Sequence, residues 1–439
     1  MRRVFIKTYG CQMNERDSES IHSFLQASGF DMVDNETSAD VIILNTCSVR
    51  ELAELKALGK LGYLARRNIV LCVLGCMAKN LAEEIKKRVP GVDIILGPGD
   101  YSKIGDYIED IISGRRTFII DVDSPGAENN LDMDSMHNVT QRQSSAFVSI
   151  MSGCNMRCSY CIVPKTRGTE RYRAMEDIIL EINKLADNGI KEVTLLGQIV
   201  NRYGFRQIEQ KDGKSAFVQL LEKIHEVPGI KRIRFTSPHP VGFHRDLIDC
   251  YKNLPKLCSQ VHLPAQSGSN RILKAMRRAY NRDDFIKIVQ ALRDTVPSIS
   301  VSTDLIVGFP GENDDDFSET CSLFDEARFD MAFIFKYSDR RGTVAASMPD
   351  QVPRDVKEYR NAVLLKKLAT HSKAYNDKML NTLQMVLVEG KARRGENIFQ
   401  GRANNHRKVL FPGDDLDVGE FVDVRITSSA VTTLYGEKI

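Results

Sequence analysis

The chain has 439 residues, of which 42% are hydrophobic and 27% are charged, so we expect a globular protein with room for two or three cored domains. Lysine and arginine exceed aspartate and glutamate by only 61 to 58, which excludes nucleic-acid binding through net charge alone. The N-terminus lacks a signal peptide's apolar core and no run of about eighteen apolar residues occurs, so we expect a cytoplasmic protein without membrane attachment.

Residues 2 to about 120 alternate short β-rich runs with helical patterns, which predicts an open parallel sheet covered by helices on both faces. The predicted strands are Arg3–Lys7, Val41–Asn45, Ile69–Leu74 and Val92–Leu96. The predicted helices between them are Asp17–Ser28, Glu51–Arg67 and Leu81–Lys87.

Three of the ten cysteines, Cys11, Cys47 and Cys76, each follow the carboxyl end of a predicted strand. These loops share one edge of a parallel sheet, so the three thiols could converge there, and the glycines before Cys11 and Cys76 would let a bulky group approach. The alternative is that each cysteine is simply a buried apolar residue. That interpretation suits Cys72 inside a predicted strand, and we extend it to Cys250, Cys258 and Cys321.

Residues 122–145 are polar and rich in turn formers, which predicts a linker. After it, six apolar runs end near Met151, Leu196, Phe235, Leu263, Val307 and Phe335, and helical patterns such as 175–188 and 282–292 separate them. Six βα units predict a partial barrel whose active site lies at the carboxyl ends of its strands.

Cys154, Cys158 and Cys161 form a C-x3-C-x2-C motif directly after the first predicted barrel strand. Three thiolates on one tight loop can hold a metal cluster and leave one coordination position open. A structural zinc site is the alternative, but zinc prefers four ligands and no fourth cysteine or histidine follows nearby. Arginines 167, 171 and 173 after this motif could bind phosphate or nucleotide, or could simply face solvent.

Residues 355–378 predict one charged helix, and short strands with glycine punctuation follow from Leu383, which predicts a small antiparallel β-barrel. A basic stretch in this region, with Phe399 and Phe411 nearby, suits an RNA surface that tracks the backbone and stacks on bases. Its candidate RNA-binding residues are Lys391, Arg393, Arg394, Arg402, Arg407 and Lys408.

The order of strand, three cysteines and α/β barrel resembles the radical S-adenosylmethionine superfamily. With the N-terminal cysteines and the C-terminal β-region, the chain resembles the methylthiotransferase family over nearly its whole length, closest to the branch that acts on N6-isopentenyladenosine in tRNA. The matching stretches are Lys7–Asn14, Asn45–Arg50, Gly75–Ala78, Gly153–Gly168, Leu195–Gln198, His262–Ser269 and Asp304–Glu312, and the segment 400–405 resembles a TRAM domain.

The resemblance implies two [4Fe–4S] clusters and S-adenosylmethionine as cofactors. Cys154, Cys158 and Cys161 would hold the cluster that cleaves S-adenosylmethionine to a radical, and Cys11, Cys47 and Cys76 would hold a second cluster that carries the sulfur to be inserted. It implies as partners a tRNA carrying N6-isopentenyladenosine, an electron donor of flavodoxin or ferredoxin type and a sulfur donor.

The resemblance also makes polar positions at barrel strand ends candidate contacts for S-adenosylmethionine: Gly197, Gln198, Ser237, Gln266 and Ser267. Each could equally be a loop residue whose polar groups are hydrogen-bonded within the protein. We expect His262 to be buried and hydrogen-bonded, and we name no catalytic base. Two departures from the family pattern, Pro238 and Arg341 in place of a proline, affect local loop shape and touch no cluster ligand.

The expected domains are therefore an N-terminal α/β domain (1–121), a linker (122–145), a radical S-adenosylmethionine partial (β/α)6 barrel (146–377) and a TRAM β-domain (378–439). The expected function is addition of a methylthio group to C2 of N6-isopentenyladenosine next to the tRNA anticodon. Two alternatives stay open: a methylthiotransferase for threonylcarbamoyladenosine or a ribosomal protein, and a non-enzymatic iron–sulfur or zinc RNA-binding protein.

Overall fold

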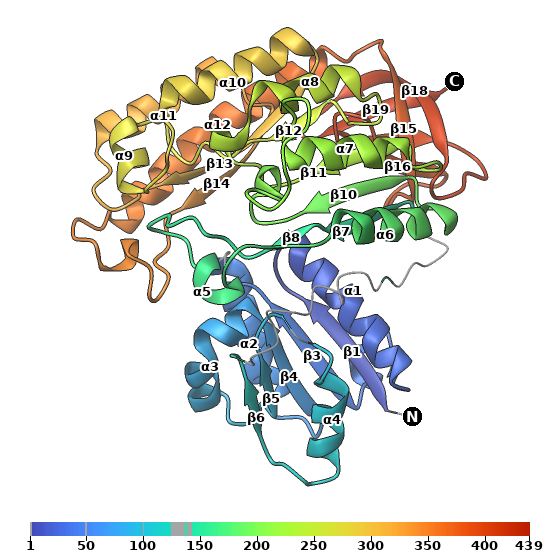
Figure 1. The fold of residues 1–439 in the computed structure, drawn as a ribbon, viewed down its shortest axis with the longest axis vertical. Helices are drawn as coiled ribbons and strands as arrows, with labels where there is room; N and C mark the ends of the chain where they lie inside the picture. Colours follow the sequence, from blue (N-terminus) through green and yellow to red (C-terminus); the bar gives the residue numbers. More distant parts are fainter. Residues whose placement is uncertain (1, 49–50, 100, 124–136, 138–142) are drawn as a thin grey trace. The chain divides into compact units, whose positions relative to one another are not determined.

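The computed structural model describes residues 2–48, 51–99, 101–123, 137 and 143–439, so most of the predicted linker lies outside the described residues. The chain divides into two compact units (Figure 1). Unit 1 comprises Met1–Asn138, Phe147–Ile178 and Arg340–Thr343, and unit 2 comprises Val139–Ala146, Ile179–Asp339 and Val344–Ile439. No helix among the described residues is both long enough and apolar enough to cross a membrane.

Unit 1 contains the open parallel sheet that the N-terminal sequence predicts. Its strands lie in the order β2-β1-β3-β4-β5-β6, and every pairing is parallel. The strands are β1 (Arg3–Thr8), β2 (Asp31–Met32), β3 (Val41–Thr46), β4 (Val70–Gly75), β5 (Ile94–Leu96) and β6 (Ile119–Asp121). The sequence analysis missed β2 and β6 because two or three residues are too few to show a period.

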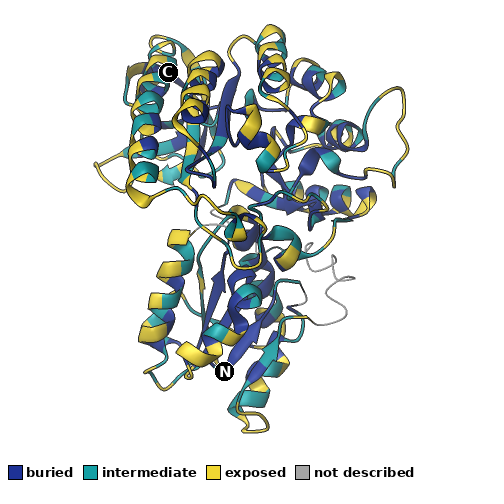
Figure 2. Ribbon diagram, turned by 90° about the vertical axis from the view of Figure 1, so that its left-hand side faces the viewer, coloured by how far each residue is buried: buried dark blue, intermediate teal, exposed yellow. Residues whose placement is uncertain are grey.

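Helices cover both faces of this sheet, so every side chain of its central strand β3 is buried. On β3, Ile42 packs in one core with α2 (Glu51–Leu64) and α3 (Cys76–Arg88). Its neighbour Ile43 packs in the opposite core with α1 (Gln12–Ala27) and α4 (Ile104–Ile112). Figure 2 shows these strands as buried and the outer helix faces as exposed, as a doubly covered parallel sheet requires.

The central region confirms the partial barrel, with six strands in two three-stranded sheets of order β11-β10-β7 and β12-β13-β14. The strands are β7 (Ser145–Ser149), β10 (Glu192–Leu196), β11 (Arg232–Phe235), β12 (Gln260–His262), β13 (Ser300–Val307) and β14 (Met331–Lys336). The helices that alternate with them are α6 (Met175–Asp187), α7 (Ala216–Glu226), α8 (Arg245–Asn253), α9 (Asn270–Ala275), α10 (Arg282–Thr295), α11 (Asp314–Ala327) and α12 (Arg354–Asp377). A parallel bridge between Ile233 and Leu257 joins the two sheets.

The C-terminal strands close into a five-stranded barrel of order β15-β16-β17-β19-β18. They are β15 (Leu383–Lys391), β16 (Ile398–Arg402), β17 (Lys408–Pro412), β18 (Phe421–Ser429) and β19 (Thr433–Lys438), and every pairing is antiparallel except the parallel pair β17–β19. Phe399 and Phe411 pack inside this barrel and are only 3% and 1% exposed. The expectation that these two rings stack on bases is wrong, because they fill the barrel core.

Within unit 2, buried arginines fasten the small barrel to the strands of the partial barrel. Arg232 of β11 donates to the backbone carbonyl oxygens of Arg402 and Met385, at 2.7 and 2.6 Å. Arg234, two residues later on the same face, donates to the carbonyl oxygen of Asn404 at 2.9 Å. These are charge-assisted hydrogen bonds to backbone groups, so the contact depends little on which side chains the small barrel carries there.

Arg407, expected above to contact RNA, is buried in the same junction. Its Nη2 donates to Oδ1 of Asp330 at 2.8 Å, and both side chains are less than 10% exposed. Asp330 also accepts from the Ser300 hydroxyl and the Val301 amide, both at 2.7 Å. The Arg407 guanidinium is therefore committed to an internal ion pair with a fully bonded carboxylate.

Removing Arg407 should loosen the C-terminal barrel. Arg407→Met leaves the Asp330 carboxylate buried without its cation, and we expect a loss of about 3–5 kcal/mol in the free energy that protects the barrel amides. Hydrogen exchange of β15–β19 in urea measures this loss. The matched control is Arg402→Met, whose partner Glu389 is about one-third exposed, and which should cost less than about 1 kcal/mol. Equal losses of protection free energy in the two variants would contradict the role of the buried Arg407–Asp330 ion pair as the anchor of the barrel.

Candidate functional site

The structure gathers the three N-terminal thiols at the carboxyl edge of the sheet in unit 1. Cys11 caps the start of α1, Cys47 directly follows β3, and Cys76 is the first residue of α3 after β4. The thiols of Cys11 and Cys47 share a hydrogen bond, and the charge of Cys11 acts on Cys76. The predicted convergence is thus present in the structure.

Two glycines make this close approach of backbone segments possible. Gly10 has φ +149°, and a Cβ built on it would lie 2.4 Å from the Cβ of Cys47. Gly75 has φ +92°, and its Cβ would lie 2.5 Å from the carbonyl oxygen of Thr46. Any larger residue would force the loops apart, so glycine is required here for both space and conformation.

Burial and hydrogen bonding give the thiols different acidities. A hydrogen bond from Cys47 lowers the pKa of Cys11 to about 6, and this effect outweighs its burial. Burial raises the pKa of Cys76, although Arg167 and a hydrogen bond from Thr166 act in the opposite direction. Cys72, enclosed within β4, has a pKa raised well above its usual value by burial. The structure therefore separates a thiolate-forming group from a purely structural cysteine.

A pair of fully buried asparagines fixes the first two cysteine loops. Nδ2 of Asn14 donates to Oδ1 of Asn45 at 3.1 Å and to the carbonyl oxygen of Thr46 at 3.0 Å. Nδ2 of Asn45 donates in return to the carbonyl oxygen of Asn14 at 2.9 Å. Reciprocal bonds of this kind hold the start of α1 against the end of β3, and so hold Cys11 near Cys47. The sequence analysis did not identify these two supports.

The second cysteine loop also belongs to unit 1, between β8 (Met151–Ser152) and α5 (Val163–Arg167). Cys154 is 8% exposed, whereas Cys158 and Cys161 are half-buried. The amide of Cys154 donates to the carbonyl oxygen of Gly168 at 3.0 Å, and the amide of Cys161 donates to that of Cys158 at 3.1 Å. The loop thus has a fixed base and two thiols at its surface.

The arginines that follow this loop divide between buried and half-buried positions. Arg167 forms an ion pair with Asp17 at 2.6 Å, and both side chains are 8% exposed. Arg173 is 5% exposed and donates to the carbonyl oxygen of Ser149 at 2.8 Å. Arg171 is half-buried on β9 (Arg171–Tyr172). Two of the three residues considered for phosphate contact therefore have internal partners.

The two triads suit a cluster better than a single ion. Among residues whose placement is described, no three His, Cys, Asp or Glu side chains stand close enough to bind one metal ion. A [4Fe–4S] cluster differs because each thiolate binds a separate iron, so its ligands stand farther apart. Three thiols per site, on loops that follow strand ends, fit such a cluster with one iron left open.

The candidate contacts for S-adenosylmethionine follow successive barrel strands. Gly197 and Gln198 come directly after β10, and Oε1 of Gln198 is buried without a hydrogen-bond partner among the described residues. Ser237 and Gln266 follow β11 and β12 with φ of +55° and +66°. Non-glycine residues in this region are strained, and such strain is concentrated at ligand sites.

Ser267 and His262 have internal partners instead. The Ser267 hydroxyl accepts from the Ser269 amide at 3.2 Å, at the start of α9. Nδ1 of His262 lies 3.0 Å from the Ser302 hydroxyl, and its Nε2 lies 3.3 Å from Oδ1 of Asp304. The expected hydrogen bond of His262 is present, but the side chain is half-buried and not buried as the sequence analysis expects.

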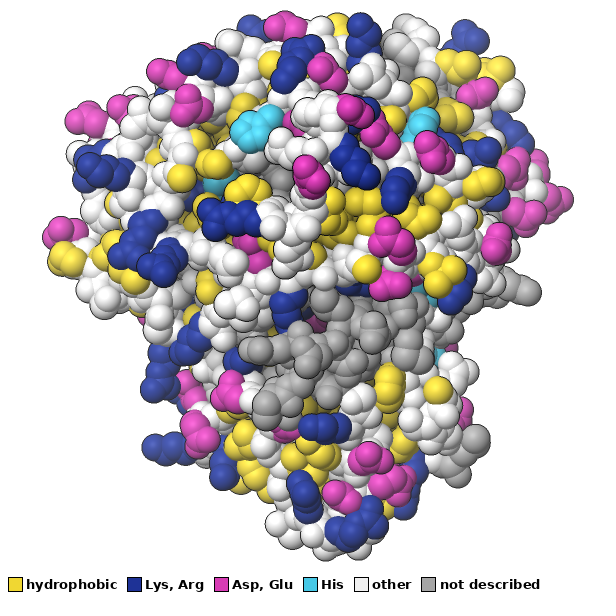
Figure 3. Space-filling model, viewed as in Figure 1, with side chains coloured by type: hydrophobic (Ala, Val, Ile, Leu, Met, Phe, Trp, Pro, Cys, Tyr) yellow, Lys and Arg dark blue, Asp and Glu magenta, His cyan; other side chains and the backbone are white. Residues whose placement is uncertain are grey.

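The basic residues of the small barrel lie on its β15–β17 side. Lys391, Arg393 and Arg394 are exposed around the β15–β16 turn, and Arg402 pairs in register with Lys408 on the next strand. Arg402 also forms an ion pair with Glu389 at 3.0 Å. Figure 3 shows cationic and anionic side chains interspersed on the face in view, in agreement with the near-balanced total charge.

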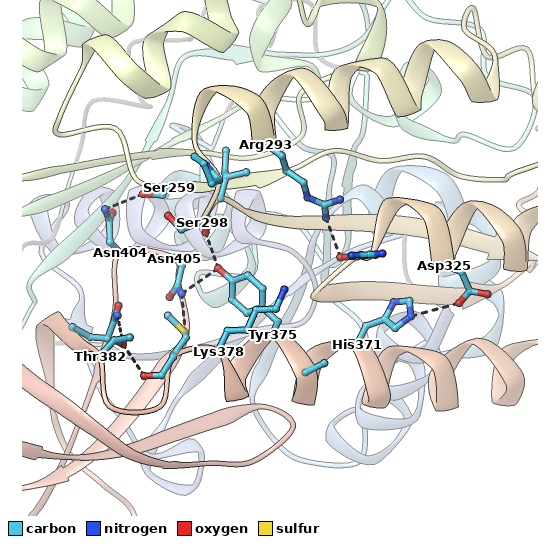
Figure 4. Close-up of a pocket in the computed structure, with 16 residues that line it drawn as sticks. Ser259, Arg293, Ser298, Asp325, His371, Tyr375, Lys378, Thr382, Asn404 and Asn405 are labelled. Carbon is cyan, nitrogen blue, oxygen red and sulfur yellow. Dashed lines mark hydrogen bonds and ion pairs between the residues drawn. The ribbon is translucent and has the colours of Figure 1, made fainter.

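A cavity of about 920 Å³ lies at the amino ends of β12 and β13, beside α12 and the small barrel (Figure 4). Its polar groups largely satisfy one another: the Tyr375 hydroxyl donates to the Ser298 carbonyl at 3.0 Å, and Asn404 donates to the Ser259 hydroxyl at 3.2 Å. None of the site residues predicted from sequence lines it. It is therefore separate from the candidate site at the carboxyl ends of the strands.

Three family models match the chain in order. Residues 3–97 match the uncharacterized protein family UPF0004, residues 148–324 match the radical SAM superfamily, and residues 377–439 match the TRAM domain. The tRNA-2-methylthio-N(6)-dimethylallyladenosine synthase of Opitutus terrae is 48% identical over 100% of this chain and 97% of its own length. The synthase of the same name from Akkermansia muciniphila is 44% identical over 99% of this chain and 98% of its own.

The chain belongs to the tRNA-2-methylthio-N(6)-dimethylallyladenosine synthase family. Solved structures are similar at lower identity. The radical S-adenosylmethionine methyltransferase TsrM from Kitasatospora setae, with tryptophan and aza-SAM bound, has a TM-score of 0.56 and 13% identity over 76% of this chain and 73% of its own. The cobalamin-dependent radical enzyme OxsB has a TM-score of 0.51 and 12% identity over 84% of this chain and 56% of its own. These two likenesses show the fold.

In this member of the synthase family, the acidity of Cys11 can be tested directly. Because its pKa is lowered to about 6, Cys11 of the metal-free protein should react with iodoacetamide already at about pH 6.5, where an ordinary thiol is protonated. Mass spectrometry of labelled peptides from about pH 5 to about pH 9 gives the midpoint. Cys72 is the control and should stay unlabelled. A Cys11 midpoint above about pH 8 would contradict the assigned hydrogen bonding.

Proposed function

We propose that the protein is a radical methylthiotransferase that adds a methylthio group to C2 of N6-isopentenyladenosine beside the anticodon of tRNA. Two sets of three cysteines, each at strand ends and each one ligand short of a complete cluster, carry this proposal. The full-length identity to synthases named for this product supports the substrate. An aromatic C–H bond is too strong for a side-chain base, so its activation needs radical chemistry.

The six cysteines take two roles in this proposal. Cys154, Cys158 and Cys161 hold the cluster beside which S-adenosylmethionine binds, and Cys11, Cys47 and Cys76 hold the second cluster. When bound, the two clusters supply the electron for cleavage of S-adenosylmethionine and the sulfur atom for insertion. The protein fixes both sets of thiols and keeps one position of each open.

The strand-end residues of the partial barrel bind S-adenosylmethionine. The unpartnered Oε1 of Gln198 accepts a hydrogen bond from its amino group, and Gly197 lets the methionyl part approach the backbone. Ser237 and Gln266 follow β11 and β12 with positive φ, and strained backbone of this kind, which is concentrated at ligand sites, supports their place here. Ser267 supports the loop through its bond to Ser269. Binding orients the sulfonium before cleavage, which is the protein's main contribution to a cofactor-driven step.

We divide the chain into an α/β domain at 1–121, a linker at 122–145, the partial barrel at 146–377 and the TRAM domain at 378–439. The TRAM domain binds tRNA through Lys391, Arg393, Arg394, Arg402 and Lys408, while Arg407 anchors the domain. A flavodoxin- or ferredoxin-type protein supplies electrons, and a further partner supplies sulfur. The tRNA substrate places the reaction in the cytoplasm.

Nucleoside mass spectrometry of tRNA from a knockout strain tests the reaction and the substrate. The knockout should accumulate N6-isopentenyladenosine, wild-type protein should restore its 2-methylthio form, and Cys11→Ala should restore none. Reconstituted Cys11→Ala protein should retain cleavage of S-adenosylmethionine, and its iron should fall from about eight to about four per chain.

Each contrary outcome points to one part of the proposal. Thiomethylation by Cys11→Ala would contradict the N-terminal cluster. Loss of a 2-methylthio threonylcarbamoyladenosine or of a modified ribosomal protein in the knockout would change the substrate but keep the chemistry. Failure of the reduced wild-type protein to cleave S-adenosylmethionine would leave a non-enzymatic iron–sulfur or zinc protein.

Neutralising the basic turn of the small barrel should weaken tRNA binding. The triple variant Lys391→Ala, Arg393→Ala, Arg394→Ala removes three exposed cations, and we expect roughly tenfold weaker binding at ~0.1 M salt with a salt slope reduced by about 2. Filter binding across salt concentrations measures both. Lys87→Ala on α3, also exposed, is the control and should change neither value. An unchanged slope in the triple variant would exclude this surface.

A further inference from the structure

The ion pair between Arg167 and Asp17 lies beside the N-terminal cysteines and has no role in the function described so far. Nη2 of Arg167 lies 2.6 Å from Oδ2 of Asp17, and each side chain is 8% exposed. Asp17 belongs to α1, the helix that Cys11 caps. Arg167 ends α5, six residues after Cys161. The pair therefore joins the two cysteine-bearing segments of unit 1.

The guanidinium of Arg167 also acts on two thiols of the N-terminal triad. Its pKa is raised well above the usual value, because the negative charges of Asp17, Cys76 and Cys11 outweigh the opposing effect of its burial. In return, Arg167 lowers the pKa of both Cys11 and Cys76. Asp17 opposes this effect of Arg167 at both thiols.

A fixed buried cation matters at this place because the site collects negative charge. Three thiolates and a sulfur ligand in a buried environment are poorly solvated, so a nearby positive charge stabilises them. Thr166, the residue before Arg167, contributes a hydrogen bond to Cys76. The short helix α5 thus delivers a charge and a hydrogen bond to the N-terminal site, and both are known means of tuning a cluster's reduction potential.

Resting on the proposed function, we propose that Arg167 is a positioning residue for the N-terminal cluster, whose fixed positive charge raises the reduction potential of that cluster while Asp17 moderates the charge. Reduction adds one negative charge to the site, and the nearby guanidinium favours that added charge. Asp17 disfavours it. The two partners of one ion pair therefore act on the potential with opposite sign.

The test uses the full chain with Cys154, Cys158 and Cys161 changed to alanine, so that iron and potential report the N-terminal site alone. After anaerobic reconstitution, iron content and a redox titration followed by electron paramagnetic resonance are measured for Arg167→Gln, Arg167→Lys and Asp17→Asn. We expect about four irons per chain, a more negative potential for Arg167→Gln, a nearly parental one for Arg167→Lys and a more positive one for Asp17→Asn.

Arg173→Gln is the matched control, because Arg173 is a buried arginine of the same segment whose guanidinium donates to the carbonyl oxygen of Ser149. It should leave the potential unchanged. Shifts of the same sign in Arg167→Gln and Asp17→Asn, or no shift in either, would overturn the inference. If Arg167→Gln does not retain iron, the Asp17→Asn variant tests the inference by itself. A more positive reduction potential in that variant supports the inference, and an unchanged or more negative one contradicts it.

The proposed function fails in a different way. If the parent variant with intact Cys11, Cys47 and Cys76 binds no iron, the ligand assignment is wrong regardless of Arg167. If it binds iron and the charge variants leave its potential unchanged, the assignment stands and the role of Arg167 is structural.

Discussion

Parallel strands end together at one edge of a sheet, and the chemistry of this protein depends on that constraint. Cys11, Cys47 and Cys76 are far apart in the chain, yet each follows one of three adjacent strands, so β1, β3 and β4 deliver them to one place. The same rule places the residues after β10, β11 and β12 at one end of the partial barrel. The order of the strands in the sheet therefore determines which of the side chains that follow them lie close together.

Bringing thiols together creates a charge problem that the surrounding residues must resolve. Thiolates with no compensating partners would be penalised by burial, as the raised pKa of Cys72 shows. At the N-terminal site the opposing contributions come from the Cys47 thiol, Thr166 and Arg167. The glycines before Cys11 and Cys76 remove side chains where the loops approach most closely. Glycines therefore provide the space at this site, and other residues compensate its negative charge.

Periodicity and spacing predicted most of the fold and the cysteine sites from sequence. Long β-rich runs such as Val41–Asn45 fixed the parallel sheet, and the six cysteines stood out because a strand end preceded each loop. The strands β2 and β6 escaped detection, since two or three residues carry little pattern. Phe399 and Arg407 were misread for another reason: a strand residue near a basic stretch can face the barrel core or a junction instead of solvent.

The contacts around the ligands are the part that sequence cannot supply. Asp17 and Arg167 are 150 positions apart, and neither stands out in its segment as a member of an ion pair. Asn14 and Asn45 lie within the cysteine motifs but resemble ordinary polar loop residues until their burial is known. Such pairs depend on the relative placement of whole elements, here α1, β3 and α5. Once that placement is known, electrostatics identifies Arg167, because a buried cation shared between a carboxylate and two thiols acts on whatever the thiols bind.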